Sequence, residues 1–119
     1  MADVKTYQGG CHCGSVRYQA EADLVHVVDC NCSICMKRGA LWTFVKAAQF
    51  KLLQGEGSLT DYQFGKKNIH HLFCRSCGIG SFSRGIAPNG DETFALNVSC
   101  LDGVDVAELK TMPFDGKSM

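Results

Sequence analysis

Cysteine is the residue type with the most chemical potential in this sequence, because eight cysteines occur among 119 residues. Seven of them fall into three tight clusters, and Cys100 stands alone. Closely spaced thiols can bind metal ions, form disulfides or carry out redox chemistry, so their spacing must decide between these uses. The clusters are CHC with Cys11 and Cys13, CNCSIC with Cys30, Cys32 and Cys35, and CRSCG with Cys74 and Cys77.

The CRSCG motif is typical of a metal-binding turn. Two residues between Cys74 and Cys77 let the chain fold back so that both sulfurs reach one ion, and Gly78 relieves the tight backbone. A redox pair with the same spacing is expected to precede a helix, whereas GIGSF follows here. We therefore favour metal binding over redox chemistry for this pair.

The cysteines divide most simply into a group of four and a group of three. Thiolates around a tetrahedral zinc lie about 3.8 Å apart, whereas residues two apart in a straight strand are separated by about 6.6 Å. The CHC segment must therefore bend, which Gly9, Gly10 and Gly14 allow. This division predicts a closed site and a site with three protein ligands: Cys11, Cys13, Cys74 and Cys77 in the first, and Cys30, Cys32 and Cys35 in the second.

Other residues could complete the second site. Cys100 is one candidate, although its position in the apolar segment FALNVSC is more typical of a buried thiol. His70 and His71 are further candidates, but they point to opposite faces if they lie in a strand, so at most one would face a metal. If none of them binds, the fourth zinc position is open, which is the mark of a catalytic site. A substrate thiol would suit that position and would lose its proton there at neutral pH.

Two basic residues, Lys37 and Arg38, directly follow Cys35. They could bind the carboxylates of a glutathione-like ligand or offset the charge of the thiolates. The alternative is a solvated helix face. Trp42 is the only tryptophan, and we expect it to pack in the core rather than to line a pocket.

Short segments of alternating polarity predict a small, mainly β, antiparallel protein that forms one domain over residues 1–119. In the segment 15–21, Val16, Tyr18 and Ala20 share one face. One short helix is expected over 33–39, and the tail from residue 112 is expected to be a loop packed by Phe114. Strands are predicted at 15–21, 24–30, 40–45, 50–54, 59–64, 69–74 and 93–100, with turns at 9–10, 55–57, 65–68 and 88–91.

Charge and composition exclude several functions. The formal net charge is zero, with 12 basic and 12 acidic residues, so we expect no nucleic-acid partner. The sequence shows neither a signal peptide nor an apolar run long enough to span a membrane, and we expect a cytoplasmic protein without a membrane partner. In a reducing cytoplasm the many cysteines point to metal or catalysis rather than to disulfides.

Five stretches of sequence follow one another along the chain: GGCHCGSVRY, DCNCSICMKRGAL, HLFCRSCGI, NVSCLDG and FDGK. Their order resembles the glutathione-dependent formaldehyde-activating enzyme family, which is related to centromere protein V. The resemblance runs from about Gly10 to Lys117, nearly the whole chain. Each motif alone is moderately specific, and the five together are specific.

The resemblance implies a β-tent fold of antiparallel sheets that carries two zinc ions per chain. Motif by motif, it places a structural zinc on the four-cysteine group and a catalytic zinc on the three-cysteine group. The family's nominal reaction adds glutathione to formaldehyde, and it is classed as a carbon–sulfur lyase. We therefore expect a zinc-dependent enzyme of this type acting on a small thiol and an aldehyde. The alternative is a non-catalytic zinc-stabilised module that binds a partner protein.

Overall fold

The computed structural model describes residues 4–65, 69–87 and 89–115, which form two β-sheets, one α-helix and four short 3₁₀ turns. The smaller sheet has the strand order β1 (Lys5–Gly10), β2 (Arg17–Ala22), β5 (Phe50–Gln54). The larger sheet has the order β10 (Thr111–Phe114), β3 (Val27–Cys30), β4 (Trp42–Lys46), β9 (Glu92–Asn97), β8 (Phe82–Ile86), β7 (Ile69–Cys74), β6 (Leu59–Tyr62). The helix is α1 (Ser33–Arg38), and the 3₁₀ turns are η1 (Ala47–Gln49), η2 (Glu56–Ser58), η3 (Val98–Cys100) and η4 (Val106–Glu108).

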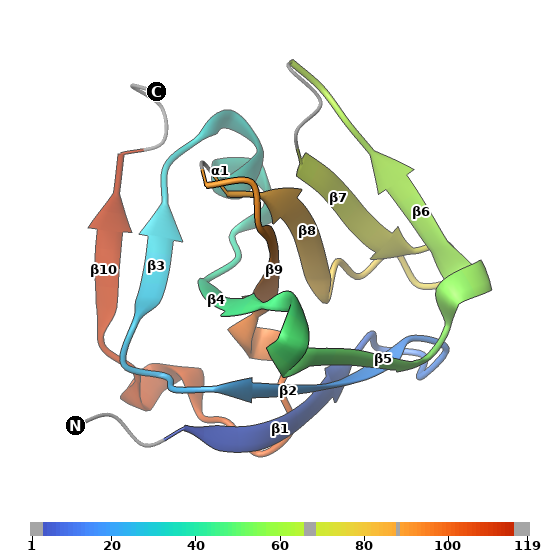
Figure 1. Ribbon diagram of the computed structural model, residues 1–119, viewed down its shortest axis with the longest axis horizontal. Coiled ribbons are helices and arrows are strands. Elements are labelled where there is room, and N and C mark those ends of the chain that lie inside the picture. Colours follow the sequence, from blue (N-terminus) through green and yellow to red (C-terminus); the bar gives the residue numbers. More distant parts are fainter. Residues whose placement is uncertain (1–3, 66–68, 88, 116–119) are drawn as a thin grey trace.

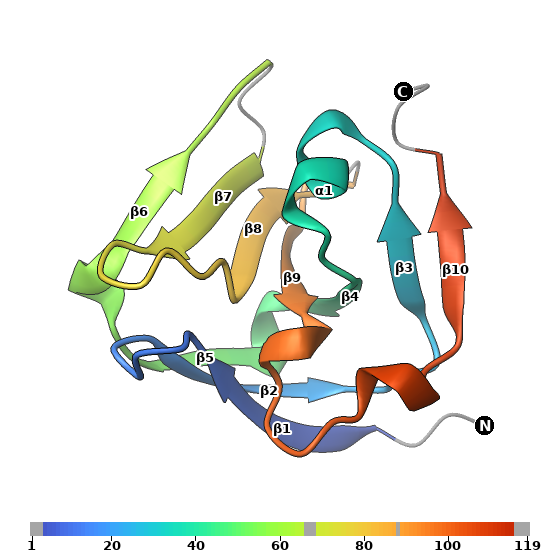
Figure 2. The same ribbon diagram turned by 180° about the vertical axis from the view of Figure 1, so that it is seen from behind.

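The larger sheet is strongly curved and rises from one side of the smaller sheet (Figure 1). Its two ends, β10 with β3 and β7 with β6, stand apart from each other, and α1 lies between them. The view from behind shows the same arrangement, with both ends of the sheet on either side of the helix (Figure 2). The expected fold class, a small and mainly β protein with little helix, is confirmed, and its strands pair antiparallel except for β10 with β3.

The core lies between the two sheets and is built around an aromatic cluster. Val16, Tyr18 and Ala20 are buried on one face of β2, as the alternation predicts. The Tyr18 ring packs against Phe50, and Phe50 stacks on Phe94 with a centroid distance of 4.1 Å. The Tyr18 hydroxyl donates a hydrogen bond of 3.0 Å to the Ser81 carbonyl, which satisfies its polar end inside the core.

All seven predicted strands correspond to strands of the structure. The segments 50–54 and 69–74 have the bounds of β5 and β7, and the other five overlap β2, β3, β4, β6 and β9. The segment 93–100 leaves the sheet early, because the Asn97 side chain accepts a hydrogen bond from the Ser99 N–H and starts a 3₁₀ turn. The turns at 55–57 and 89–91 are present, while residues 66–68 and 88 of the predicted turns lie outside the described residues.

The predicted turn at Gly9 and Gly10 is wrong, because both residues belong to β1. Glycine is needed at both positions because neighbouring atoms pack closely against them. A Cβ at Gly9 would lie 2.8 Å from the Cys100 carbonyl oxygen and 2.9 Å from the Tyr18 hydroxyl. A Cβ at Gly10 would lie 2.0 Å from the Val16 carbonyl oxygen. The missing side chains therefore let β1 lie directly against the core and against its partner strand.

The predicted loop at the tail is also wrong for residues 112–114, which belong to β10 and pair in parallel with β3. This pairing joins Phe114 to Cys30, so it depends on a contact that no local pattern reveals. Pro113 is compatible with this strand because β10 is at the edge of its sheet. Phe114 is 46% exposed and lines a pocket instead of packing a loop, and residues 116–119 lie outside the described residues. Strand β8 was not predicted.

The predicted helix over 33–39 is confirmed as α1, with Gly39 as its C-cap. Gly39 has a φ of 66°, and its N–H donates a hydrogen bond of 2.9 Å to the Cys35 carbonyl. Across the described ranges, none of the helices has the length and apolar character needed to cross a membrane.

Replacing Gly55 by alanine should destabilise the protein by more than about 2 kcal/mol. Gly55 has a φ of 98°, and a Cβ there would lie 2.4 Å from the Ser15 carbonyl oxygen and 2.7 Å from Val16 Cα. Gly57→Ala is the matched control, because its Cβ position meets no heavy atom within 4 Å among the described residues beyond its own turn of the chain. Chemical denaturation should show a change within about 0.5 kcal/mol for the control. Equal effects of the two substitutions would contradict this explanation.

Candidate metal centres

The first cluster of sulfurs joins two distant parts of the chain. Cys11 and Cys13 lie on the loop after β1, Cys74 ends β7, and Cys77 lies in the turn that follows. Their four sulfur atoms all lie within 4.8 Å of one another. The Cys13 sulfur is 3.7 Å from those of both Cys11 and Cys74, which fits the spacing of about 3.8 Å for thiolates on one tetrahedral zinc. The donor set and its spacing therefore fit a single zinc ion.

Backbone N–H groups donate hydrogen bonds to sulfurs of this cluster, while burial raises the pKa of the Cys11 thiol. The N–H of Val16 donates to the Cys11 sulfur at 3.3 Å, and that of Ser76 donates to the Cys74 sulfur at 3.4 Å. Backbone N–H groups of Cys13 and Ile79 lower the pKa of the Cys77 thiol to about 6. Such an arrangement prepares these sulfurs for a cation.

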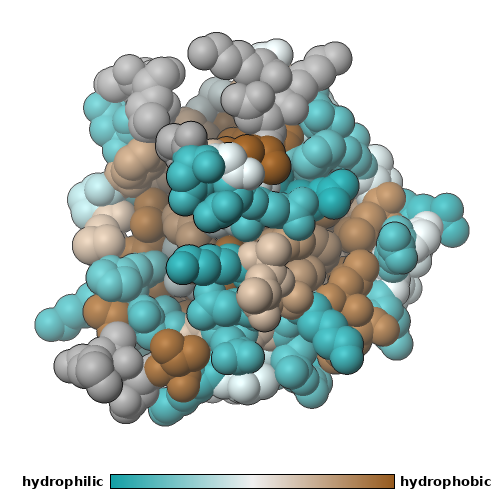
Figure 3. Space-filling view, in the orientation of Figure 1, coloured by the Kyte–Doolittle hydropathy of each residue, from teal (hydrophilic) through white to brown (hydrophobic). Residues whose placement is uncertain are grey.

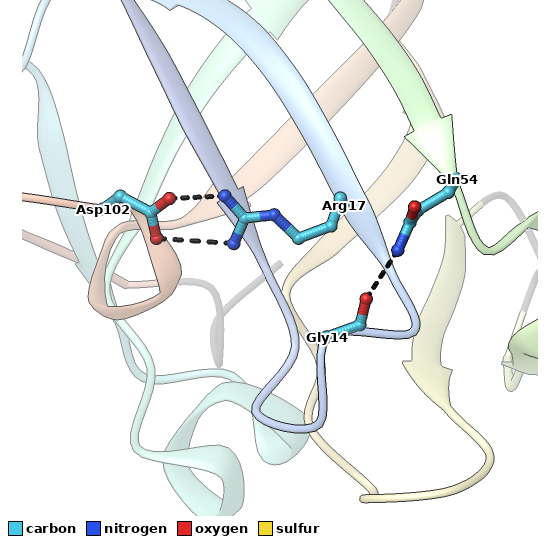
Figure 4. Close-up of polar contacts among 4 residues, drawn as sticks. All are labelled: Gly14, Arg17, Gln54 and Asp102. Carbon is cyan, nitrogen blue, oxygen red and sulfur yellow. Dashed lines mark hydrogen bonds and ion pairs between the residues drawn. The ribbon is translucent and has the colours of Figure 1, made fainter.

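Contacts on both sides hold the loop that carries Cys11 and Cys13 (Figure 4). The Gln54 side chain of β5 donates a hydrogen bond of 2.7 Å to the Gly14 carbonyl. On the other side Arg17 forms a two-pronged ion pair with Asp102, with 3.4 Å between Nη1 and Oδ1. These contacts fix the bend that the CHC spacing requires, and Gly14 adopts a φ of 85° at its end.

The second cluster is built from one short stretch of chain. Cys30 ends β3, Cys32 is the N-cap of α1, and Cys35 lies in its first turn. The three sulfurs lie within 4.8 Å of one another. Burial, and then the hydrogen bond with Cys32, raise the pKa of Cys35 to about 12. A bound cation would reverse this effect, because it stabilises thiolates that otherwise repel one another.

The residues considered as a fourth ligand do not join this second cluster. Among residues 4–65, 69–87 and 89–115, Cys100 does not belong to the cluster of three sulfurs, and neither does any histidine or carboxylate. His70 faces Asp61, with 2.6 Å between Nδ1 and Oδ2, while His71 points to the other side of β7 and lines a pocket. The second cluster thus offers three protein ligands within the described chain, and zinc binding by both clusters stays a prediction.

A pocket of about 630 Å³ lies beside the second cluster, and Cys30, Cys32 and Cys35 form part of its wall. It lies on the concave side of the larger sheet. The strands that contribute to its lining are, in their order in the sheet, β10, β3, β4, β9, β8 and β7. Small residues line it on the central strands β8 and β9, and larger apolar residues surround them. The small residues are Ser83, Gly85, Thr93 and Ala95, and the apolar ones are Val28, Ile34, Trp42, Phe44, Ile69, Ile86 and Phe114.

Arg38 lines this pocket, whereas the neighbouring Lys37 is exposed and does not. The Arg38 guanidinium lies 5.3 Å from the centre of the Trp42 ring and donates to the Leu72 carbonyl at 3.3 Å. Gly80 makes room for it, since a Cβ there would lie 1.9 Å from Nη2. Within the described chain no carboxylate lies within ion-pair distance of Arg38, so its charge is available to the nearby thiolates.

The sequence did not single out several residues of this pocket. Phe44, Ile69, Ile86 and Arg84 were missed, although Phe44 and Ile69 lie in predicted strands. Trp42 was expected in the core; it is only 4% exposed, yet it also lines the pocket. Its indole N–H is buried without a hydrogen-bond partner in the described part of the protein. Strand alternation could have predicted that Phe44 and Trp42 share one face of their strand. It could not have predicted that this face lines a pocket.

Replacing Cys74 by serine should remove one tightly bound zinc and lower the free energy of unfolding by several kcal/mol, because Cys74 ties β7 to the CHC loop. Native mass spectrometry and thermal unfolding would measure both effects. Cys100→Ser is the matched control, since this partly buried thiol belongs to neither cluster. An unchanged zinc count in Cys74→Ser would show that the four sulfurs do not form a metal site.

His71 should make the protein sensitive to mild acid. Burial, and then the nearby Arg38, lower the pKa of His71 from its ordinary value of 6.5. The unfolded chain therefore takes up this proton first as the pH falls, and the native state loses stability below about pH 6.5. His71→Gln removes this loss, so the stability of wild type relative to the variant should fall as the pH drops from about 7.5 to 5.5. A constant difference, with both proteins zinc-loaded, would contradict the prediction.

Two comparisons with known proteins agree with this geometry. Residues 6–113 match the family described as glutathione-dependent formaldehyde-activating enzyme. A crystal structure of a protein from Rhodobacter sphaeroides is similar to this chain, with a TM-score of 0.79 and 33% sequence identity. The similarity covers 89% of this chain and 97% of the other. The chain belongs to the glutathione-dependent formaldehyde-activating enzyme family.

Proposed function

We propose that this protein catalyses the addition of a thiol to an aldehyde such as formaldehyde, and the reverse cleavage of the carbon–sulfur bond. The observation that carries the proposal is the position of Cys30, Cys32 and Cys35 in the wall of a pocket large enough for a small organic molecule. Family membership supports the same class of reaction, with glutathione as the thiol named in the family's description.

We assign one zinc to each sulfur cluster. Cys11, Cys13, Cys74 and Cys77 would hold a structural ion, and Cys30, Cys32 and Cys35 would hold a catalytic one. Sulfur donors suit zinc, and the two clusters differ in the number of ligands that the described chain supplies. When bound by these three thiolates, a zinc ion would lower the pKa of a substrate thiol so that the thiol would ionise at neutral pH.

The pocket residues supply the remaining requirements of the reaction. The addition forms a sulfur–carbon bond, breaks the carbon–oxygen double bond to a single bond, and moves the thiol proton to the oxygen. His71 is suited to carry this proton, because it lines the pocket and imidazole exchanges protons near neutral pH. Arg38 offsets the negative charge of the thiolate cluster, and the apolar walls exclude water from the reacting groups.

The alternative function is a zinc-stabilised module that binds a partner protein without catalysis. Exposed apolar side chains could contact such a partner, and Phe44, Ile86 and Tyr62 are each more than half exposed. On the face shown in Figure 3, however, apolar and hydrophilic side chains are intermixed. A thiol-accessible second zinc favours the enzyme, whereas two zincs that both resist chelation and ignore added thiol would favour the binding module.

Cys32→Ser should reduce catalysed thiol–formaldehyde exchange by about a hundredfold or more, because it removes one of three ligands from the proposed catalytic ion. NMR exchange measurements on zinc-loaded protein would follow the formation and cleavage of the adduct above the spontaneous rate. Cys100→Ser is the control and should keep the activity, since Cys100 lies outside both clusters. Full activity and two bound zincs in Cys32→Ser would refute the proposed site.

A further inference from the structure

The chemistry of the pocket lining limits which thiol can bind beside the second cluster. The strands of the larger sheet turn alternate residues toward the pocket, such as Trp42 and Phe44 on β4, and Ile69 and His71 on β7. Thr93 and Ala95 on β9 also line the pocket, and their small side chains leave space between the larger side chains of β4 and β7. The resulting space is bounded mainly by carbon, with aromatic rings and branched aliphatic side chains as its walls.

The few polar groups of the lining do not match a peptide. A tripeptide thiol such as glutathione carries an ammonium group, two carboxylates and two peptide bonds. Among the described residues of the lining there is no aspartate or glutamate, so an ammonium group would find no carboxylate from this part of the chain. Two arginines line the pocket, and Arg38 already contacts Trp42, Ser83 and the Leu72 carbonyl. Arg84 is exposed, so an ion pair between it and a substrate carboxylate would be weakened by solvent. Peptide groups placed against Phe44 or Ile86 would lose water without gaining hydrogen bonds.

We propose that the thiol bound in this pocket carries an apolar body, aromatic or branched aliphatic, rather than a peptide. The inference rests on the proposed thiol chemistry at Cys30, Cys32 and Cys35, and it specifies the substrate class of that site. An aromatic ring among Phe44, Ile69 and Ile86 would be removed from water, and each apolar surface that it covers adds to affinity. The pocket volume of about 630 Å³ far exceeds the needs of formaldehyde itself, which leaves room for such a body.

The only tryptophan, Trp42, provides a direct signal for occupancy of the pocket. Zinc-loaded full-length protein would be titrated with 2-phenylethanethiol, glutathione and 2-phenylethanol, and binding followed by calorimetry and by Trp42 emission. We expect 2-phenylethanethiol to bind at least about tenfold more tightly than glutathione, because its ring buries apolar surface. The alcohol, which has the ring but no sulfur, should bind more weakly than the thiol. Native mass spectrometry after each titration would verify that both zincs remain bound.

A substitution at the pocket wall provides a second test. Phe44→Asn should weaken binding of 2-phenylethanethiol by about fivefold or more and leave glutathione binding unchanged. Phe44 is 55% exposed, so the fold should tolerate the change. Leu53→Asn is the matched control, because Leu53 is 44% exposed on β5 of the other sheet and does not line the pocket. The control should leave both affinities as in wild type.

The outcomes separate this inference from the proposed function. If glutathione binds as tightly as 2-phenylethanethiol, or more tightly, the apolar-substrate inference is overturned while thiol chemistry at the second cluster stands. Equal binding of 2-phenylethanol and 2-phenylethanethiol would mean that sulfur makes no contact with the metal, which overturns the proposed function. Loss of aryl-thiol binding in Leu53→Asn as well as in Phe44→Asn would show a general structural effect and would also overturn the assignment of the pocket.

Discussion

The convergence of four sulfur atoms, from Cys11, Cys13, Cys74 and Cys77, is the constraint on which the rest of the structure depends. Cys11 and Cys13 belong to the loop after β1 of the smaller sheet. Cys74 ends β7, which is next to the edge strand of the larger sheet, and Cys77 lies in the turn that follows. A small domain buries limited apolar surface, so a metal ion bound by these four sulfurs would contribute strongly to its stability. Fixing the end of β7 also fixes the position of His71 and of the Leu72 carbonyl beside the pocket.

Arg38 connects the helix with the larger sheet on the other side of the molecule. It is the last residue of α1, and it reaches Leu72 on β7, Ser83 on β8 and Trp42 on β4. Burying a cation is unfavourable unless anions or dipoles compensate it. Here a backbone carbonyl and an aromatic face provide part of that compensation. The position of α1, and with it that of Cys32 and Cys35, is thereby tied to the strands that form the pocket.

The two sulfur clusters use the same residue type in different surroundings. Four thiols around the Cys11 loop complete a tetrahedral donor set, whereas the three thiols around Cys32 lie at a pocket wall. Ligand count and access to a pocket, rather than ligand chemistry, would therefore distinguish the proposed structural site from the proposed catalytic one. The apolar side chains around the second cluster then decide which molecules can approach it.

The sequence alone determined the local half of this architecture. The spacing within CNCSIC and CRSCG brings neighbouring sulfurs together through short turns, and alternation buries one face of β2, because both effects act over a few residues. Tertiary structure decided the rest. The choice of Arg38 over Lys37, the parallel pairing of β10 with β3, and the apolar pocket all depend on contacts between distant segments. Ligand count pointed to the union of Cys11 with Cys74, but only folding of the curved sheet over the smaller one brings these sulfurs within reach of each other.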